Sequence, residues 1–321
     1  MLPNGKFEDG VIKSLIADDF EVLFRTSLSE CIRRRVSEFA LMYREVTDEE
    51  YESCLLTILR AIHDPAIPKA GAHRQDNWEK GWLENFHAWE ATAGGKGAKI
   101  NAILPRYFGK YGFLRINRTL IRPLSDNFEY FSLCLITDWL FDVYMRKAGS
   151  IYEFGCGTGY HLVRLRNYNP TASLFGLDWA PASQKIISSL ASQGYVTNMQ
   201  GLRFDYFNPD QNIRLAADSI VYTVASLEQL GRDFNPFLAY LLRNRPSLCV
   251  HVEPIAELLD KSNILDFLSI EYFQKRNYLT GFLDRLHALK AEGKIDIVLE
   301  QRSFIGSLLI DGYSIVVWKP V

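Results

Sequence analysis

The segment Ile151-Tyr-Glu-Phe-Gly-Cys-Gly-Thr-Gly159 constrains the fold of this chain more than any other. The apolar residues over 150–154 predict a β-strand, and the spacing over 160–168 predicts a helix. The turn between them is rich in glycine, so its backbone can approach a ligand closely, and the first N–H groups of the helix point at the same place. This order of elements predicts a ligand site inside an α/β domain.

The spacing of the glycines distinguishes between possible ligands. The dinucleotide fingerprint has its third glycine three positions after the second, whereas this chain has GxGxG, with Gly155, Gly157 and Gly159. Glu153 stands two positions before the first glycine. A carboxylate there would repel a pyrophosphate but would attract the cationic amino group of a methionine moiety. We therefore expect no binding of NAD or NADP. Taken alone, the motif leaves a purely structural glycine turn as the alternative.

Strands and helices alternate from Ser150 to the end of the chain. We expect strands over 150–154, 173–177, 202–205, 219–224, 247–252, 295–304 and 313–318. We expect helices over 160–168, from Pro181 onward, over 234–242 and through much of 255–291. This alternation predicts an α/β fold with a Rossmann-like, doubly wound and mostly parallel sheet of seven strands, in which the last strand is antiparallel.

The first part of the chain has a different pattern. Residues 11–91 have helical periodicity, residues 113–122 resemble a short hairpin, and a long helix is expected over 127–146. One helical stripe carries the aromatic residues Trp78, Trp82, Phe86 and Trp89. We interpret the stripe as core packing rather than ligand stacking. We divide the chain into a mainly helical region for substrate recognition, residues 1–125, and a cofactor-binding domain, residues 126–321.

Composition and charge exclude several other classes of protein. Hydrophobic residues make up 48% of the chain, which is typical of a folded globular protein. The 36 basic and 38 acidic side chains nearly balance, so a dominant role in binding nucleic acid is not favoured. The five cysteines are scattered without a CxxC pair, and no metal site is expected. The beginning of the chain lacks the features of a signal peptide and no membrane span is read, so we expect a cytoplasmic protein.

The acid–x–GxGxG pattern resembles the first motif of the class I S-adenosylmethionine-dependent methyltransferases, and the resemblance covers residues 150–321. In that family the glycine loop contacts the methionine part of the cofactor. An acid at the end of the second strand holds the ribose hydroxyls, and Asp178 stands there. An acid near the third strand binds the adenine amine, which matches Asp205. Trp179 and Tyr206 follow these acids. They either border the adenine or pack against the protein as structural aromatic residues.

The resemblance implies a set of residues that bind S-adenosylmethionine. The helix before the glycine motif lies over the cofactor in related folds, so this set includes one residue from that helix. The set is Glu153, Gly155, Cys156, Gly157, Gly159, Asp178, Trp179, Asp205, Tyr206, Ala225 and Tyr130.

Three residues at the ends of the fourth and fifth strands are candidates for a general base. The segment Val224–Leu230 resembles a segment that has the sequence Leu-Glu-His in many small-molecule methyltransferases. In this chain Gln229 replaces the histidine. Strand ends of an open α/β sheet face the ligand crevice. Glu228, His251 and Glu253 are therefore the candidates. The Asn/Asp-Pro-Pro-aromatic motif of amine methyltransferases is absent, and so is a cysteine near residue 225, which disfavours a nucleic-acid substrate.

The implied activity is methyl transfer to a small molecule, and our first choice of acceptor is a hydroxyl of a sugar or glycan precursor. Two alternatives stay open: methylation of protein or RNA, and a non-catalytic binding module with a methyltransferase fold. Arg115, Arg118 and Arg122 in the expected hairpin either bind an anionic substrate group or form a solvated face. The sequence leaves the oligomeric state open.

Overall fold

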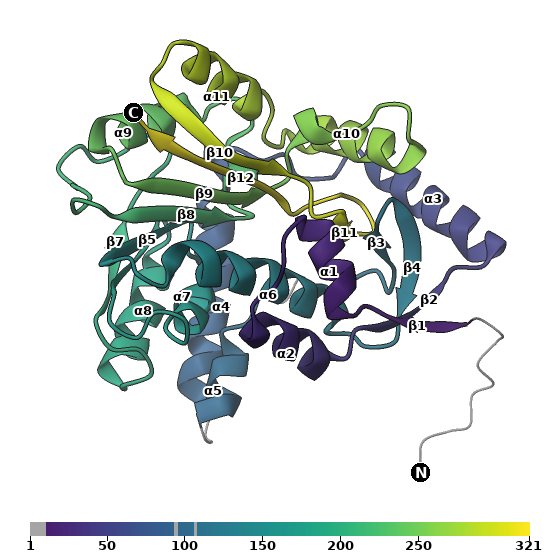
Figure 1. Cartoon of the computed structure of the whole chain (residues 1–321), viewed down its shortest axis with the longest axis horizontal. Coiled ribbons are helices and arrows are strands. Elements are labelled where there is room, and N and C mark those ends of the chain that lie inside the picture. The colour runs from purple at the N-terminus through teal and green to yellow at the C-terminus, as the bar shows by residue number, and fades with distance from the viewer. Residues whose placement is uncertain (1–10, 93–95, 106–107) are drawn as a thin grey trace.

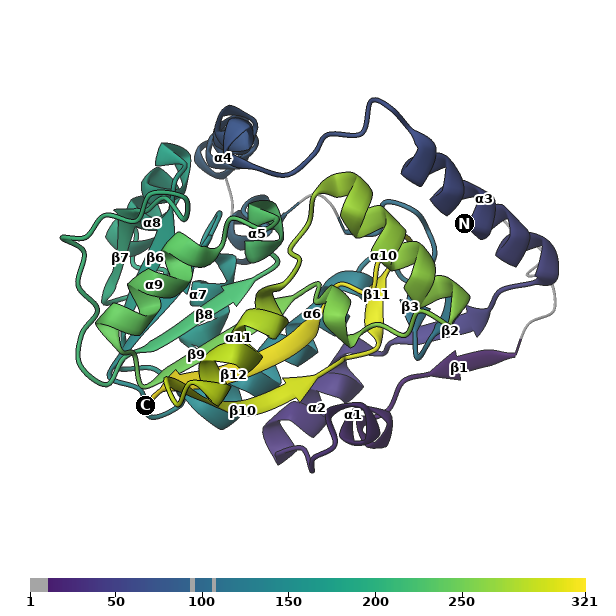
Figure 2. The same ribbon diagram turned by 90° about the horizontal axis from the view of Figure 1, so that it is seen from above.

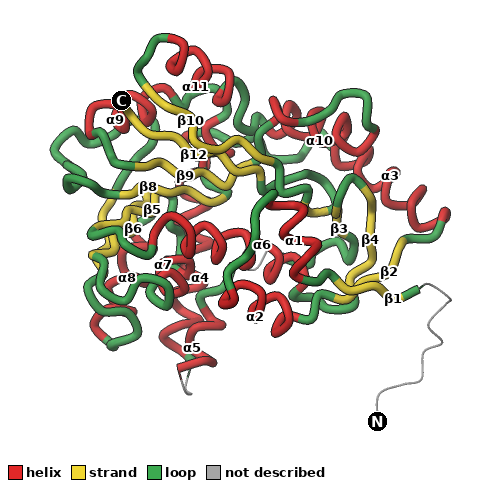
Figure 3. The backbone as a smooth tube through the Cα atoms, viewed as in Figure 1, coloured by secondary structure: helices red, strands yellow, loops and turns green. Residues whose placement is uncertain are grey.

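Two β-sheets and the helices that surround them make up the computed structural model, which describes residues 11–92, 96–105 and 108–321 (Figure 1). The larger sheet is formed by residues after 150, and the smaller sheet combines N-terminal strands with one strand from near the C-terminus. The tube view in Figure 3 shows the strands of the larger sheet running between groups of helices.

In the described residues, the larger sheet has seven strands in the order β10-β12-β9-β8-β5-β6-β7. Its strands are β5 (Ser150–Phe154), β6 (Ser173–Asp178), β7 (Met199–Arg203), β8 (Ile220–Val224), β9 (Leu248–Glu253), β10 (Ile295–Gln301) and β12 (Ser314–Pro320). The five strands from β7 to β9 are parallel, whereas β12 is antiparallel to both of its neighbours. The predicted α/β class with a mostly parallel sheet is confirmed.

Helices cover both faces of this sheet because its central strands are apolar on both sides. In β5, Ile151 faces one core cluster and Tyr152 the other, as expected when side chains alternate along a strand. The first face is covered by α6 (Phe128–Leu140), α7 (Tyr160–Leu165) and α8 (Pro181–Ser192). The second is covered by α9 (Asn235–Asn244) and α11 (Phe282–Ala291). A five-residue π-helical segment, Phe141–Met145, continues α6 toward β5.

Among its described residues, the N-terminal part contains helices and four strands. The helices are α1 (Ala17–Phe24), α2 (Glu30–Phe39), α3 (Asp48–His63), α4 (Gln75–Ala91) and α5 (Lys96–Ala102). The strands are β1 (Ile12–Ser14), β2 (Met42–Glu45), β3 (Leu114–Ile116) and β4 (Thr119–Pro123). Together with β11 (Ile305–Ser307) they form a sheet in the order β1-β2-β4-β3-β11. The expected hairpin is present as β3 and β4, and Asn117 and Arg118 form its two-residue turn with positive φ angles of 47° and 62°.

The structure corrects the sequence interpretation in two places. The N-terminal region is not only helical with one hairpin, since β1 and β2 extend that hairpin into a sheet. The third strand of the larger sheet ends at Arg203, so Asp205 lies beyond the strand and not at its end. The apolar pattern Leu202-Arg-Phe204 suggested a later strand, but Phe204 turns into the core after the strand has ended. The boundary at residue 125 stays a prediction.

Two helices bring distant parts of the chain over the C-terminal ends of the parallel strands. The indole of Trp89 in α4 donates to Ser189 Oγ in α8 at 2.9 Å, so α4 lies along α8 (Figure 2). Helix α10 (Ile264–Arg276) lies near β11, and Arg276 O accepts a hydrogen bond from Ala70 N at 2.7 Å. These contacts place residues from 74–82 and 272–278 around the strand ends, where Pro105, Lys110 and Tyr111 also lie.

Candidate functional site

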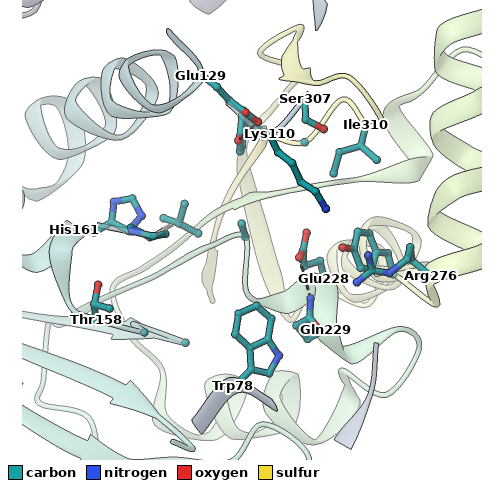
Figure 4. Close-up of a pocket in the computed structure, with 18 of the residues that line it drawn as sticks. Trp78, Lys110, Glu129, Thr158, His161, Glu228, Gln229, Arg276, Ser307 and Ile310 are labelled. Atoms are coloured by element: carbon teal, nitrogen blue, oxygen red, sulfur yellow. Dashed lines mark hydrogen bonds between the residues drawn. The ribbon is translucent and has the colours of Figure 1, made fainter. Parts of the chain in front are cut away.

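Two adjoining cavities lie at the C-terminal ends of β5, β6 and β8. The larger has a volume of about 310 Å³ and the smaller about 60 Å³. Five residues line both cavities and join them: Trp78, Trp82, Gly155, Ala225 and Gln229. Figure 4 shows the larger cavity between the glycine-loop side, marked by Thr158 and His161, and the opposite side, marked by Arg276.

The glycine loop forms one wall of both cavities, and it accepts no side chain at two positions. Gly155 and Gly157 have φ angles of 67° and 52°. A Cβ atom on Gly155 would lie 2.4 Å from Ser226 Cβ, and one on Gly157 would lie 2.9 Å from the Trp82 ring. Gly159 serves a different purpose, because it caps α7 and lies outside the lining of the cavities.

Two buried acids flank this loop. Glu153 lines the larger cavity and accepts a hydrogen bond from Tyr222 OH at 2.9 Å, and burial raises its pKa well above the usual value. Asp178 lines the smaller cavity and accepts N–H bonds from Gly157 and Ala180, each at 2.9 Å. Burial raises the pKa of Asp178 to about 6, so its carboxylate form predominates at neutral pH. Each of the two adjoining cavities thus contains one of these acids.

Aromatic side chains line the smaller cavity beside Asp178. Trp179 stacks on Phe207 with ring centroids 5.9 Å apart, and Phe204 and Tyr206 also line this cavity. The Tyr206 hydroxyl forms a 2.9 Å hydrogen bond with Ser226 Oγ. A planar, apolar ring system is the kind of group that such a surface accommodates.

Besides Gly159, two further expected cofactor contacts are not found in the lining of either cavity. Asp205 accepts the N–H of Phe207 at 2.9 Å, and it is directed into its own turn. Tyr130 packs against Phe108 and Tyr160 beneath the loop. The expectation for these two residues came from family position, but the earlier end of β7 and the core packing of α6 place them elsewhere. The structure does bring together Glu153, Gly155, Cys156, Gly157, Asp178, Trp179, Tyr206 and Ala225 around the cavities.

Of the three candidates for a base, Glu228 reaches the cavity. Its Oε1 accepts a hydrogen bond from Gln229 Nε2 at 2.9 Å. Burial raises the pKa of Glu228 to about 8, and the neighbouring Glu253 contributes in the same direction. A carboxyl group with a pKa near the working pH is suited to remove a proton from a substrate.

The structure gives His251 and Glu253 structural positions, in contrast to the expectation. His251 Nε2 accepts the Trp318 indole N–H at 2.9 Å, and its Nδ1 lies 2.9 Å from Thr223 Oγ1. Burial lowers the pKa of His251 to about 3, so the ring is neutral. Glu253 accepts N–H bonds from residues 226, 227 and 228 and fixes the loop that carries Glu228. Neither side chain lines a cavity.

The aromatic stripe of α4 has two functions, of which the sequence interpretation found one. Trp89 is fully buried and packs on α8, as expected. Trp78 and Trp82 instead line both cavities, with their rings stacked at 5.4 Å. The same helical spacing continues beyond the part of α4 that α8 covers, so periodicity alone does not separate the two functions.

The three arginines of the hairpin line neither cavity. Arg115 is buried and donates to Leu308 O and Leu309 O at 2.9 and 3.1 Å. Arg118 and Arg122 form ion pairs with Asp260 and Glu50. No sequence motif identifies the other charged and aromatic residues that line the larger cavity, because they come from separate segments. They are Arg74, Lys110, Tyr111, Tyr272, Arg276 and Tyr278.

Neither a metal centre nor a membrane-spanning helix is found among residues 11–92, 96–105 and 108–321. In these ranges, no group of three or more His, Cys, Asp and Glu side chains is placed to hold a metal ion. No helix of the same ranges combines the length and apolar character required to cross a membrane.

No protein-family model matches the sequence, and no curated protein matches it either. The chain is similar to the magnesium protoporphyrin IX methyltransferase ChlM of Synechocystis PCC 6803, solved with bound SAH, with 10% identity and a TM-score of 0.49 over 78% of this chain and 99% of that one. It is also similar to the dimethyltransferase RosA of Streptomyces davawensis, with 14% identity and a TM-score of 0.43 over 61% of this chain and 58% of that one. A third similar structure is the N-methyltransferase NodS of Bradyrhizobium japonicum WM9, with 9% identity and a TM-score of 0.43 over 60% of this chain and 87% of that one.

Proposed function

We propose that this protein is an S-adenosylmethionine-dependent methyltransferase that acts on a small molecule. The observation that carries the proposal is the arrangement around the glycine loop. Asp178 and stacked aromatic rings lie on one side of Gly155 and Gly157, and the larger cavity with Glu153 lies on the other. An elongated ligand with an aromatic base, a ribose and a cationic amino acid has matching groups in that order.

The residues present fit such a cofactor. Trp179, Phe204 and Phe207 would border the adenine, and the Asp178 carboxylate would accept the ribose hydroxyls. Glu153 would face the amino group of the methionine part, and a bound cation there would favour its ionised form. The bare backbone of Gly155 and Gly157 gives the cofactor room. NAD and NADP fit poorly because Glu153 stands where a pyrophosphate would lie.

The protein's own contribution to the reaction is alignment and proton removal. When bound, the cofactor supplies a methyl group that is already activated on a sulfonium. The cavity walls hold the acceptor in line and exclude water. Glu228, in its ionised form, takes the proton from an acceptor hydroxyl. Glu253 keeps the 226–228 loop in place through its three backbone hydrogen bonds.

The dimensions of the cavity support a small acceptor. The larger cavity has a volume of about 310 Å³ and is bounded by residues from α4, from the segment before β3, from α10 and from β11. A sugar or glycan-precursor hydroxyl stays our first choice because polar and aromatic side chains alternate in the lining. The size of the cavity favours a small acceptor over a protein or an RNA.

Calorimetric titration with S-adenosylhomocysteine tests the proposal. We expect the wild-type protein to bind it and Asp178→Ala to bind about 10- to 150-fold more weakly, because hydrogen bonds to a charged group contribute about 1.5–3 kcal/mol. Asp178→Asn should lose most of the same affinity while it keeps the shape of the side chain. Gly157→Val should abolish binding.

The exposed acid Asp296 offers a matched control, and Asp296→Ala should bind like the wild type. Circular dichroism checks that each variant is folded. Unchanged affinity in the folded Asp178 variants, or binding of NAD by the wild type, would contradict the proposed cofactor.

A further inference from the structure

Three cationic side chains line the larger cavity on the side away from the glycine loop. Arg74 precedes α4, Lys110 lies in the segment before β3, and Arg276 ends α10. Figure 4 shows Lys110 extending into the cavity from the Glu129 side, toward Arg276 and Glu228. We call these three residues the cation cluster.

None of the three forms an ion pair with the part of the chain that the structure describes. The Nε atoms of Arg74 and Arg276 are buried and have no hydrogen-bond partner there. Arg276 donates one hydrogen bond, from Nη1 to Tyr272 OH at 3.1 Å. The guanidinium of Arg74 lies over Trp78 at 5.7 Å, and that of Arg276 lies over Tyr278 at 4.9 Å. Both planes are thus held by aromatic rings, while donor groups stay available.

The charge balance of the cavity favours an anion. Burial lowers the pKa of Arg74, and the positive charge of Arg276 lowers it further because the two guanidinium groups repel each other. Burial raises the pKa of the facing carboxyls Glu129, Glu153 and Glu228, which reduces the negative charge that they offer to the cations. Like charges that are held close together in a partly desolvated site are destabilising unless an opposite charge joins them.

We propose that the cation cluster binds an anionic group of the acceptor, a carboxylate or a phosphate. The inference rests on the proposed function, since it assigns the outer part of the same pocket. Guanidinium groups bind carboxylates and phosphates through paired N–H donors, and the stacked rings reduce the freedom that binding would remove. Glu228 lies beside both arginines, so one small acceptor reaches the base and the cation cluster together.

Three probes test this inference on the full-length protein saturated with S-adenosylhomocysteine. Benzoate and phenyl phosphate carry the two anionic groups, and benzamide has the shape of benzoate without its charge. We expect titration to show binding of one or both anions, with benzamide at least about tenfold weaker. The preference between benzoate and phenyl phosphate identifies which anion the site selects.

Variants then locate the binding site. Arg74→Gln and Arg276→Gln should each weaken anion binding by about tenfold or more, without a change in affinity for benzamide or S-adenosylhomocysteine. Lys110→Gln, at an exposed position, should reduce anion binding even if an arginine variant fails to fold. Arg243→Gln is the matched control, because Arg243 lies over the Tyr240 ring at 5.6 Å but far from the cavity.

The outcomes separate this inference from the proposed function. Equal affinity for benzoate and benzamide, or no binding of either anion at millimolar concentrations, would overturn the inference. Loss of S-adenosylhomocysteine affinity in the arginine variants would also overturn it, since the cations would then serve the carboxylate of the donor. Anion binding by a wild-type protein that does not bind S-adenosylhomocysteine would instead contradict the proposed function and leave the anion site standing.

Discussion

The buried carboxyls at the strand ends differ in their hydrogen-bond partners, and this difference assigns them different roles. Asp178 and Glu253 each accept backbone N–H groups, which stabilise the ionised form and fix the side chain. Glu228 accepts one side-chain amide, and burial leaves its pKa at about 8. Burial also raises the pKa of Glu253, to about 7, but Glu253 lines neither cavity. Glu228 lines the larger cavity, so it is the carboxyl placed to accept a proton from a substrate.

At the residue scale we predict a pH dependence that belongs to Glu228. Because the ionised form is the base and its pKa is about 8, kcat/KM for a hydroxyl acceptor should rise from pH 6 to pH 9. Glu228→Gln should remove this rise and lower kcat by about 10²–10⁴-fold, while affinity for S-adenosylhomocysteine is unchanged. Glu271→Gln, a change on the neighbouring helix α10, serves as control. A variant at Glu228 with normal turnover would show that alignment alone drives the reaction.

At the element scale, the sequence predicts structure wherever local pattern determines it. The apolar strands and the glycine turn after residue 150 are local features, so the expected and observed strands overlap, with the largest shift at β7. Strands β1 and β2 escaped prediction because their residues are largely exposed and show no alternation. The residues that line the cavity could not be predicted for another reason. Arg74, Lys110 and Arg276 come from separate segments, and only tertiary packing brings them together.

Two tryptophans of helix α4, Trp82 and Trp89, are predicted to affect different properties of the protein. Trp82→Ala removes the ring that contacts Gly157, so affinity for S-adenosylhomocysteine should fall about tenfold at nearly unchanged stability. Trp89→Ala removes a fully buried ring and should lower the free energy of unfolding by about 3–5 kcal/mol, with the affinity retained. Calorimetry and urea denaturation measure the two quantities. Tighter binding by Trp82→Ala would mean that this ring occupies the place of the donor.

At the scale of the whole molecule, the chain between β10 and β12 joins the two sheets. It leaves the larger sheet, forms β11 beside β3, and returns to the larger sheet as β12. Two buried arginines secure this crossing. Arg302 pairs with Asp266 and Asp311, and Arg115 links β3 to α10 and to the segment after β11. Helix α10 and strand β11, which line the larger cavity, are therefore held in place by buried polar contacts as well as by apolar packing.

This connection predicts that both halves of the chain unfold together. Arg115→Met should lower the free energy of unfolding by about 3–5 kcal/mol, because it leaves the buried carbonyls of residues 308 and 309 without their charged donor. Arg118→Met, in the same hairpin but partly exposed, should change it by less than about 1 kcal/mol. Urea denaturation followed by tryptophan fluorescence and by circular dichroism should give one coincident transition for the wild type. Two separate transitions would show that the region before residue 125 folds independently, and Arg115→Met should then destabilise the first half alone.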